Sequence, residues 1–250
     1  MILNPQRFNV STFFGKFLRL PLHLIPKSFV MPILQGPARG MKWTTGSAKH
    51  GCWLGAYETE KVQAIAKWVK PDMTVYDIGA QAGYYSCIFS RLAHRGKIFS
   101  FEPLPENIIS ILRHIRMNKL SNVQVVHTAL AGESGISGFS VEGEKHRNIL
   151  IPTENAPLLI PTISLDDAVE IHQFPLPDFL KIDVEGAENQ VLQGAQRTIE
   201  KVHPTIFLAL HGEDQKNQCF QFLQMNNYAL YDLEDRELTA PGETDEIRAT

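Results

Sequence analysis

Several features that would place this chain of 250 residues in a familiar functional class are missing from its sequence. Its three cysteines are widely separated and form no C-x-x-C pair, which argues against a disulfide framework and favours a reducing, cytoplasmic compartment. The nine histidines form no H-x-x-x-H or H-E-x-x-H pattern, so we predict no zinc site. The absence of a G-x-S-x-G turn and of a G-x-x-x-x-G-K-[ST] loop argues against a serine hydrolase and a P-loop nucleotidase.

The sequence also has no uninterrupted apolar run of about 20 residues, the length that a membrane-spanning helix needs. Its most apolar stretch, 13–34, is interrupted by three basic residues and three prolines, and it lacks the small-residue cleavage site of a signal peptide. We therefore predict no transmembrane helix and leave open a peripheral contact of this N-terminal arm with a membrane surface.

Acidic residues are absent from the first 57 positions, which carry seven basic residues. The rest of the chain has 24 − 7 = 17 basic residues against 27 acidic ones. We divide the chain into a basic extension rich in proline and glycine, 1–56, and a globular domain, 57–250. The arm either binds an anionic partner or membrane, or packs on the acidic body. An acidic body argues against nucleic acid as a partner.

Strand-like and helix-like patterns alternate along the globular domain. The predicted strands are Thr74–Ile78, Lys97–Phe101, 123–127, 178–183 and 205–210, and the longer helices are 84–93, 106–118, 187–201 and 216–225. This alternation predicts a doubly wound, mostly parallel α/β sheet, with an antiparallel edge formed by 228–238. Glycines punctuate 132–163, which we interpret as β-hairpins or an insert, and Ser164 is the predicted N-cap of a short helix.

The first predicted strand ends in Asp77 and continues into a turn with the spacing D-x-G-x-x-x-G, in which Gly79 and Gly83 are the glycines. The third glycine of a dinucleotide fingerprint is missing, so no pyrophosphate site is indicated. S-adenosylmethionine has no phosphate, and its ammonium, sulfonium and ribose diol favour carboxylates and carbonyl groups. The turn therefore favours this methyl donor. Asp77 would contact the methionine ammonium indirectly or support the glycine turn; the alternative is that it caps the next helix, and the two roles can coexist.

Two further groups of polar residues follow predicted strands. Glu102 ends the second strand, where a carboxylate can accept both ribose hydroxyls, and Pro103 fixes the turn that follows; the alternative is an exposed loop glutamate. In K-I-D-V-E-G-A-E, Asp183 and Glu185 need a nearby cation or proton to offset their repulsion, whereas Glu188 reads as a helix N-terminal acid. His211 ends a later strand as a general base or a structural residue.

Taken together, these motifs resemble the FkbM family of S-adenosylmethionine-dependent methyltransferases. The resemblance rests on D-I-G-A…G at 77–83, F-E-P at 101–103, I-S-L-D-D at 163–167, K-I-D-V-E-G-A-E at 181–188 and V-L-Q-G-A at 191–195. It implies a class I methyltransferase fold, a seven-stranded sheet whose last strand is antiparallel, and O-methylation of a sugar or secondary metabolite. The turn 77–83, Ala80 included, would hold the donor together with Glu102 and Pro103. One departure is Ala209, where family members often carry an acid two residues before the histidine.

We therefore expect an O-methyltransferase that uses S-adenosyl-L-methionine on a hydroxyl of a small molecule or glycan, with Asp183, Glu185 and His211 as the catalytic candidates. Orientation of the acceptor would supply much of the rate. Two alternatives remain open. One is a reaction assisted by magnesium or calcium with Asp183 and Glu185 among the ligands. The other is a catalytically silent binding module with the same fold.

Overall fold

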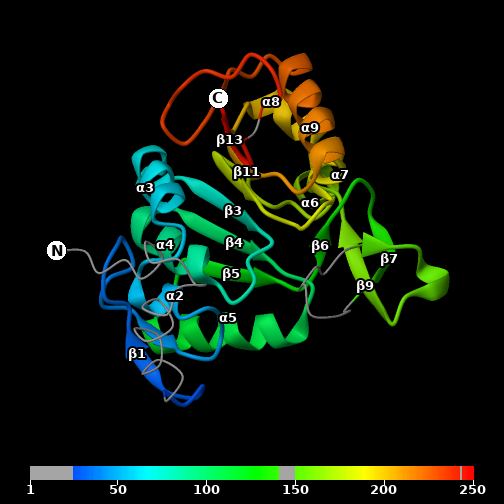
Figure 1. Cartoon of the computed structure of the whole chain (residues 1–250). Coiled ribbons are helices and arrows are strands. Elements are labelled where there is room, and N and C mark those ends of the chain that lie inside the picture. Colours follow the sequence, from blue (N-terminus) through cyan, green and yellow to red (C-terminus); the bar gives the residue numbers. More distant parts are fainter. Residues whose placement is uncertain (1–24, 141–149, 243) are drawn as a thin grey trace, which may run out of the picture.

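A computed structural model describes residues 25–140, 150–242 and 244–250 of the chain. Its centre is a seven-stranded sheet in the order β12-β13-β11-β10-β3-β4-β5 (Figure 1). The strands are β3 Thr74–Ile78, β4 Lys97–Phe101, β5 Val123–Val126, β10 Phe179–Ile182, β11 Thr205–Ala209, β12 Leu230–Tyr231 and β13 Glu246–Ala249. Neighbours from β5 to β11 pair in parallel, and β13 pairs antiparallel with both β11 and β12. The predicted mostly parallel sheet with an antiparallel last strand is confirmed. The antiparallel edge predicted at 228–238 is wrong in position, because that segment holds the edge strand β12 and the antiparallel strand is β13.

Strand order reverses direction between β3 and β10, which lie side by side although they are about a hundred residues apart in sequence. Lys181 pairs with Asp77 in register, and the amide of Asp183 donates to the carbonyl of Ile78 at 3.1 Å. In open α/β sheets, ligands bind in the crevice at such a switch point. The topology therefore brings the 77–83 turn and the 183–188 loop to one place.

Helices cover both faces of the sheet because successive strand residues point to opposite sides. One hydrophobic core contains Val75, Ile98 and Phe179 and is covered by α3 Thr59–Trp68, α4 Tyr84–Leu92 and α5 Pro105–Asn118. The other core contains Tyr76 and Leu180 and is covered by α6 Leu165–Glu170, α7 Glu188–Gln193, α8 Gln196–Val202 and α9 Glu213–Met225.

The predicted single helix over 187–201 is wrong, because the chain breaks between α7 and α8 at Gly194. A Cβ on Gly194 would overlap the carbonyl oxygen of Ala131, so the helix packs too closely there for another residue. Buried Asp166 then accepts hydrogen bonds from the amides of Arg197 at 3.0 Å and Thr198 at 2.8 Å. These bonds satisfy orphan donors in the first turn of α8 and stabilise a second helix start.

The glycine-punctuated region forms a separate four-stranded sheet in the order β6-β9-β7-β8, which projects from one side of the main sheet (Figure 1). Its strands are β6 Ala129–Leu130, β7 Gly135–Phe139, β8 Leu150–Ile151 and β9 Leu158–Ile163. The hairpin interpretation is confirmed, although residues 141–149 lie outside the described part. Ser164 caps α6 as predicted, since its Oγ accepts from the amide of Asp167 at 3.0 Å.

The described part of the N-terminal segment packs against the domain through a hairpin, β1 Val30–Pro32 and β2 Lys42–Thr44, and the short helix α2 Gly51–Leu54. Trp43 is fully buried and stacks on His114 of α5, with 3.9 Å between ring centroids. The division of the chain at residue 56 stays a prediction, and residues 1–24 of the basic arm lie outside the described part. No described helix has the length and apolarity that crossing a membrane requires.

Candidate active site

Predicted site residues follow the carboxyl ends of four adjacent strands. Glu102 comes directly after β4, Asp183 directly after β10, and His211 two residues after β11, while Asp77 is the penultimate residue of β3. Because β3, β4, β10 and β11 are parallel neighbours, these ends meet at one edge of the sheet. The arrangement that the sequence predicted for this edge is thus present in the fold.

The glycine turn after β3 has the backbone conformation that its sequence predicts. Gly79 and Gly83 have φ values of +76° and +85°, in the left-handed region where other residues are strained. A Cβ on Gly79 would overlap the carbonyl oxygen of Asp183. The amides of Gly79 and Ala80 both donate to the carbonyl of Phe101 at 3.1 Å. Gly79 is therefore required for the close approach of the turn to the loop after β10.

Asp77 is fully buried beneath this turn. Its Oδ2 accepts from the hydroxyl of Ser86 at 2.7 Å, and its Oδ1 lies 3.4 Å from Nζ of Lys181. Lys181 also donates to the carbonyl of Gly79 at 3.2 Å. Asp77 makes no side-chain cap on α4, whose N-cap is Gly83, so the capping alternative is wrong. Its contacts support the turn from below.

A pocket opens between the turn, the end of β4 and the second sheet. Among the predicted residues, it is lined by Gly79, Glu102, Pro103, Asp183 and Glu185. Apolar side chains from the second sheet close one wall: Leu130, Phe139 and Leu150. The remaining predicted residues of the turn do not line the pocket but are buried next to it: Asp77, Ala80 and Gly83. They affect the pocket through the conformation of the turn.

Glu102 projects a buried carboxylate into this pocket and is not an exposed loop residue, since only 3% of it is accessible. Its Oε2 accepts from the amide of Gln81 at 2.8 Å, and its Oε1 accepts from the amide of Leu104 at 2.9 Å. Burial raises the pKa of the Glu102 carboxyl, although these hydrogen bonds oppose the change. The side chain of Asn107 also hydrogen-bonds this carboxylate. A carboxylate has about four lone-pair sites, so Glu102 can still accept a ligand hydroxyl.

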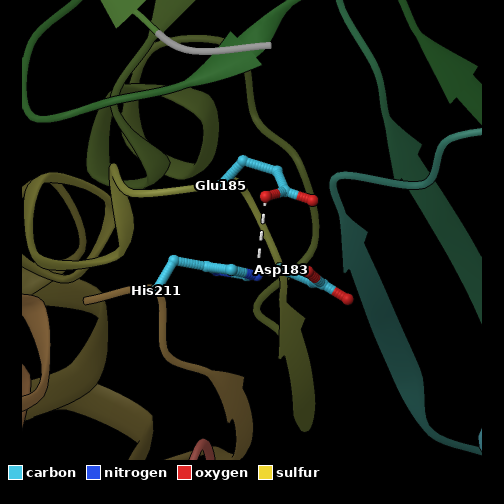
Figure 2. A group of neighbouring side chains, drawn as sticks. All are labelled: Asp183, Glu185 and His211. Carbon is cyan, nitrogen blue, oxygen red and sulfur yellow. Dashed lines mark ion pairs between the residues drawn. The ribbon is translucent and has the colours of Figure 1, made fainter. Parts of the chain in front are cut away.

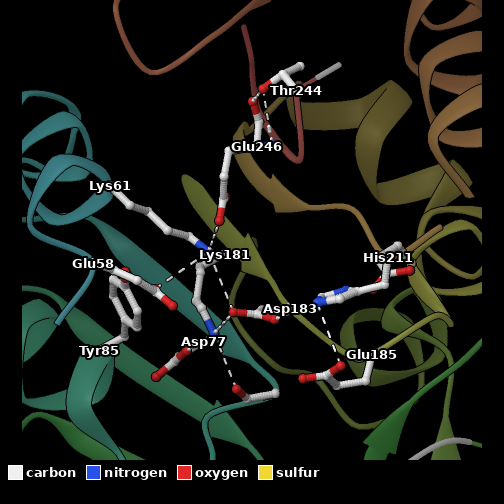
Figure 3. Close-up of polar contacts among 12 residues, drawn as sticks. Glu58, Lys61, Asp77, Tyr85, Lys181, Asp183, Glu185, His211, Thr244 and Glu246 are labelled. Carbon is white, nitrogen blue, oxygen red and sulfur yellow. Dashed lines mark hydrogen bonds and ion pairs between the residues drawn. The ribbon is translucent and has the colours of Figure 1, made fainter. Parts of the chain in front are cut away.

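Asp183 is held as an anion by two buried lysines (Figure 3). Its Oδ2 lies 3.6 Å from Nζ of Lys181 and 3.5 Å from Nζ of Lys61, and both lysine side chains are only 3% exposed. Burial opposes ionisation of Asp183, but the charges of Lys181, Lys61 and His211 outweigh it and lower the pKa of the carboxyl. A carboxylate with a lowered pKa is a weak proton acceptor.

Lys61 itself was not predicted, and neither was its closest partner, Glu246. Lys61 comes from α3 and donates to Oε1 of Glu246 at 2.8 Å, with Oε2 of Glu58 at 3.8 Å (Figure 3). Three carboxylates from three different elements therefore share this one buried cation. Their charges hold the pKa of Lys61 above its usual range although burial lowers it.

His211 lies next to the other two predicted catalytic residues (Figure 2). Its Nε2 is 3.6 Å from Oε2 of Glu185 and 3.9 Å from Oδ1 of Asp183, and its Nδ1 is 2.7 Å from Oε1 of Glu188. The hydrogen bond to Glu188, together with the charges of all three carboxylates, raises the pKa of His211 against the effect of burial. The fold thus brings all three catalytic candidates together.

One potential ligand atom from each of Asp183, Glu185 and His211 lies within 4.8 Å of the others, a spacing that a metal ion could bridge. Two lysines already compensate the charge of Asp183. The geometry therefore permits a divalent cation at this position, and the site does not need one to keep Asp183 ionised.

A family model described as the methyltransferase FkbM domain matches residues 77–237. The chain belongs to the FkbM methyltransferase family. The match covers every predicted site residue, from the glycine turn to His211.

Two curated proteins are similar to this member of the FkbM family. The hexuronic acid methyltransferase AglP of Haloferax volcanii is 26% identical over 160 residues, which are 64% of this chain and 65% of that protein. The 2-O-methyltransferase NoeI of Sinorhizobium fredii is 24% identical over 172 residues, which are 62% of this chain and 69% of that protein. The chain thus spans 65% of the length of the first relative.

Solved structures agree on the fold. An FkbM methyltransferase from Methylobacillus flagellatus KT superposes with a TM-score of 0.51 at 18% identity and covers 72% of this chain and 44% of that one. A precorrin-6y C5,15-methyltransferase from Geobacter metallireducens GS-15 has the same TM-score at 14% identity, over 86% of this chain and 97% of that one. The class I methyltransferase fold expected from the sequence is confirmed.

The departure at Ala209 is matched by a carboxylate on the neighbouring strand of this FkbM-family protein. Ala209, the last residue of β11, stands opposite Glu246 in the antiparallel register with β13. Directly opposed residues of an antiparallel pair project to the same face of the sheet. The carboxylate that β11 lacks at this level is therefore present on the neighbouring strand, where it binds Lys61.

Proposed function

We propose that this protein is an S-adenosylmethionine-dependent O-methyltransferase that acts on a hydroxyl of a sugar or another small metabolite. The observation that carries the proposal is the buried carboxylate of Glu102 in the switch-point pocket, whose lining also contains Asp183. Membership of the FkbM family supports methyl transfer. The names of two relatives, a hexuronic acid methyltransferase and a 2-O-methyltransferase, support a sugar hydroxyl as the acceptor.

The residues of the pocket fit the methyl donor in charge and shape. Glu102 offers two oxygens for a ribose diol, and the apolar wall that Phe139 and Leu130 contribute suits a purine ring. Anionic Asp183 and Glu185, on the same lining, favour a neighbouring positive charge. When bound, the donor supplies an electrophilic methyl group on a sulfonium.

His211 is the general base in this proposal. The lowered pKa of Asp183 leaves it a poor proton acceptor, whereas the pKa of His211 is raised and its side chain is 28% exposed. The neutral imidazole would take the proton of the acceptor hydroxyl at Nε2. The charges of Asp183 and Glu185 would stabilise the imidazolium that forms. Activity should therefore rise with pH through the pKa of His211, as this histidine loses its proton.

Calorimetry with S-adenosylhomocysteine tests the donor site. We expect the wild type to bind and Glu102→Gln to bind roughly 10- to 100-fold more weakly, because a hydrogen bond to a charged group contributes about 1.5–3 kcal/mol. Glu106→Gln, an exposed glutamate in the first turn of α5, is the matched control and should leave affinity unchanged. No binding by the wild type, or equal binding by Glu102→Gln, contradicts the donor assignment.

Incubation with radiolabelled donor and a pooled extract of glycans and metabolites separates an enzyme from a silent binding module. Label transferred to the extract supports the enzyme, and His211→Gln should abolish most of it if the histidine is the base. Donor binding without transfer to any extract would instead favour the binding module.

A further inference from the structure

We infer that Glu188 is a positioning residue that fixes the tautomer of His211, with the hydrogen of the neutral imidazole on Nδ1 and the lone pair of Nε2 directed to the active site. The importance of this tautomer for methyl transfer rests on the function proposed above. The tautomer itself can be observed whether or not the protein transfers methyl groups.

The first support is the burial and bonding of Glu188. The residue is fully buried at the start of α7, and its Oε1 lies 2.7 Å from Nδ1 of His211. The same oxygen accepts from the amide of Gly186 at 2.9 Å. An ionised carboxylate can only accept hydrogen bonds, so a contact of this length requires the hydrogen to be on Nδ1. The sequence interpretation of Glu188 as a helix N-terminal acid agrees with its place in α7, and its contact with His211 adds a second role.

The second support is the placement of the opposite ring nitrogen. With Nδ1 bound to Glu188, Nε2 faces Glu185 at 3.6 Å and Asp183 at 3.9 Å, and both carboxylates line the pocket (Figure 2). In the neutral ring, Nε2 carries the lone pair. The nitrogen that can accept a proton is therefore the one on the pocket side.

The loop between β10 and α7 has a conformation that makes this contact possible. Glu185 has a φ of +57° and Gly186 a φ of +102°, so two successive residues adopt left-handed backbone. For a residue other than glycine, such a conformation is strained and persists only where its surroundings stabilise it. Here the turn places Glu185 on one side of the imidazole and Glu188 on the other.

Besides His211, the carboxylate of Glu188 has a titratable neighbour in Cys219. Cys219, on the adjacent helix α9, stays a neutral thiol, because burial and the charge of Glu188 raise its pKa to about 12. The second oxygen of Glu188 is buried and has no hydrogen-bond partner among the described residues. Its other oxygen, Oε1, is the one that bonds His211 and Gly186.

Nitrogen–proton correlation NMR of the histidine rings in the full chain tests the inference, with His211 assigned by its loss in His211→Gln. We expect the Nδ1–H tautomer in the wild type above the pKa of His211. Glu188→Met keeps the volume but removes the acceptor, so the tautomer should shift toward Nε2–H. Glu188→Gln can still accept through its amide oxygen and should retain Nδ1–H.

Glu185→Gln is the matched control, because it removes a neighbouring charge on the Nε2 side and should leave the tautomer unchanged. A wild type in the Nε2–H form, or a Glu188→Met variant that keeps Nδ1–H, overturns the inference. If Glu188→Met does not fold, the tautomer of the wild type still decides. Failure to bind S-adenosylhomocysteine would overturn the proposed function alone.

The same variants show whether the tautomer matters for transfer to the pooled extract. Glu188→Met should lower the transfer rate by roughly 10- to 100-fold, a partial loss of the roughly 10²–10⁴-fold that a general base supplies. Glu188→Gln should recover part of that loss. Equal rates in the Met and Gln variants, once the tautomer has shifted, would show that Glu188 does not position a base.

Discussion

Replacement of Glu246 by glutamine should stabilise the protein at alkaline pH, although it removes one charge of a 2.8 Å ion pair with Lys61. The reason is that Glu246 shares this lysine with Asp183 and Glu58. Burial is the largest cause that raises the pKa of Glu246 to about 7, and the charges of Asp183 and Glu58 add to it against the opposing effect of Lys61. Its Oε2 is buried and has no hydrogen-bond partner in the described ranges.

The size and sign of the change in the free energy of unfolding follow from the linkage between proton binding and folding. The unfolded chain ionises Glu246 near pH 4.5 and the folded protein near pH 7, a difference of 7 − 4.5 = 2.5 pH units. At about 1.36 kcal/mol per unit, this corresponds to about 3 kcal/mol. Between these values the folded state binds more protons, so the contribution of Glu246 to stability is fully present below pH 4.5 and is lost as the pH rises through 7. Glutamine stays neutral and does not incur this loss.

Urea unfolding followed by tryptophan fluorescence at pH 4.5, 6 and 8 measures the effect. Glu246→Gln should match the wild type at pH 4.5 and exceed its free energy of unfolding by up to about 3 kcal/mol at pH 8. Glu133→Gln, an exposed glutamate, serves as the control and should show no pH-dependent difference. A Glu246→Gln variant that is less stable than the wild type at pH 8 would refute the reasoning, because the ion pair with Lys61 would then outweigh burial.

Two further predictions concern the glycine turn and the metal alternative. Gly79→Ala should lower the free energy of unfolding by at least about 2 kcal/mol and weaken S-adenosylhomocysteine binding, because residue 79 has a φ of +76° and a Cβ there would meet the carbonyl of Asp183. The control in urea unfolding is Gly135→Ala, whose new Cβ would have nothing within 4 Å. Dialysis against a chelator should leave methyl transfer to the pooled extract unchanged, because two lysines compensate Asp183. Loss of transfer that magnesium restores would instead establish the metal-assisted reaction.

The main strands were predictable because each is a short buried apolar run bounded by turn residues. Thr74–Ile78 and Lys97–Phe101 have the bounds that the sequence predicts. The closing strand β13 was missed, because its four residues, E-I-R-A, include two charged ones. Arg248 is buried there between the rings of Trp68 and Tyr231, with its guanidinium carbon 4.1 Å and 4.2 Å from their centroids. A contact between residues so far apart in sequence leaves no local pattern.

Site residues with a local sequence pattern were predicted, whereas those that meet only through the fold were missed. Asp183 and His211 were recognisable because they follow strands, and the ends of parallel strands meet at one edge. Lys61 reads in sequence as an ordinary helix residue, and Glu246 lies 246 − 61 = 185 positions away from it. Only the fold shows that their side chains meet at 2.8 Å.

The acidic surplus of the site connects its stability with its proposed function. Around the edge of the sheet, two buried lysines and one histidine face six carboxylates: Glu58, Asp77, Asp183, Glu185, Glu188 and Glu246. Such a surplus destabilises the protein without ligand, which is the effect that Glu246→Gln should relieve. The same surplus would attract the proposed donor, which carries a sulfonium and an ammonium. A site built for a cationic ligand is therefore expected to gain stability when it loses a carboxylate, and to lose affinity for that ligand by the same change.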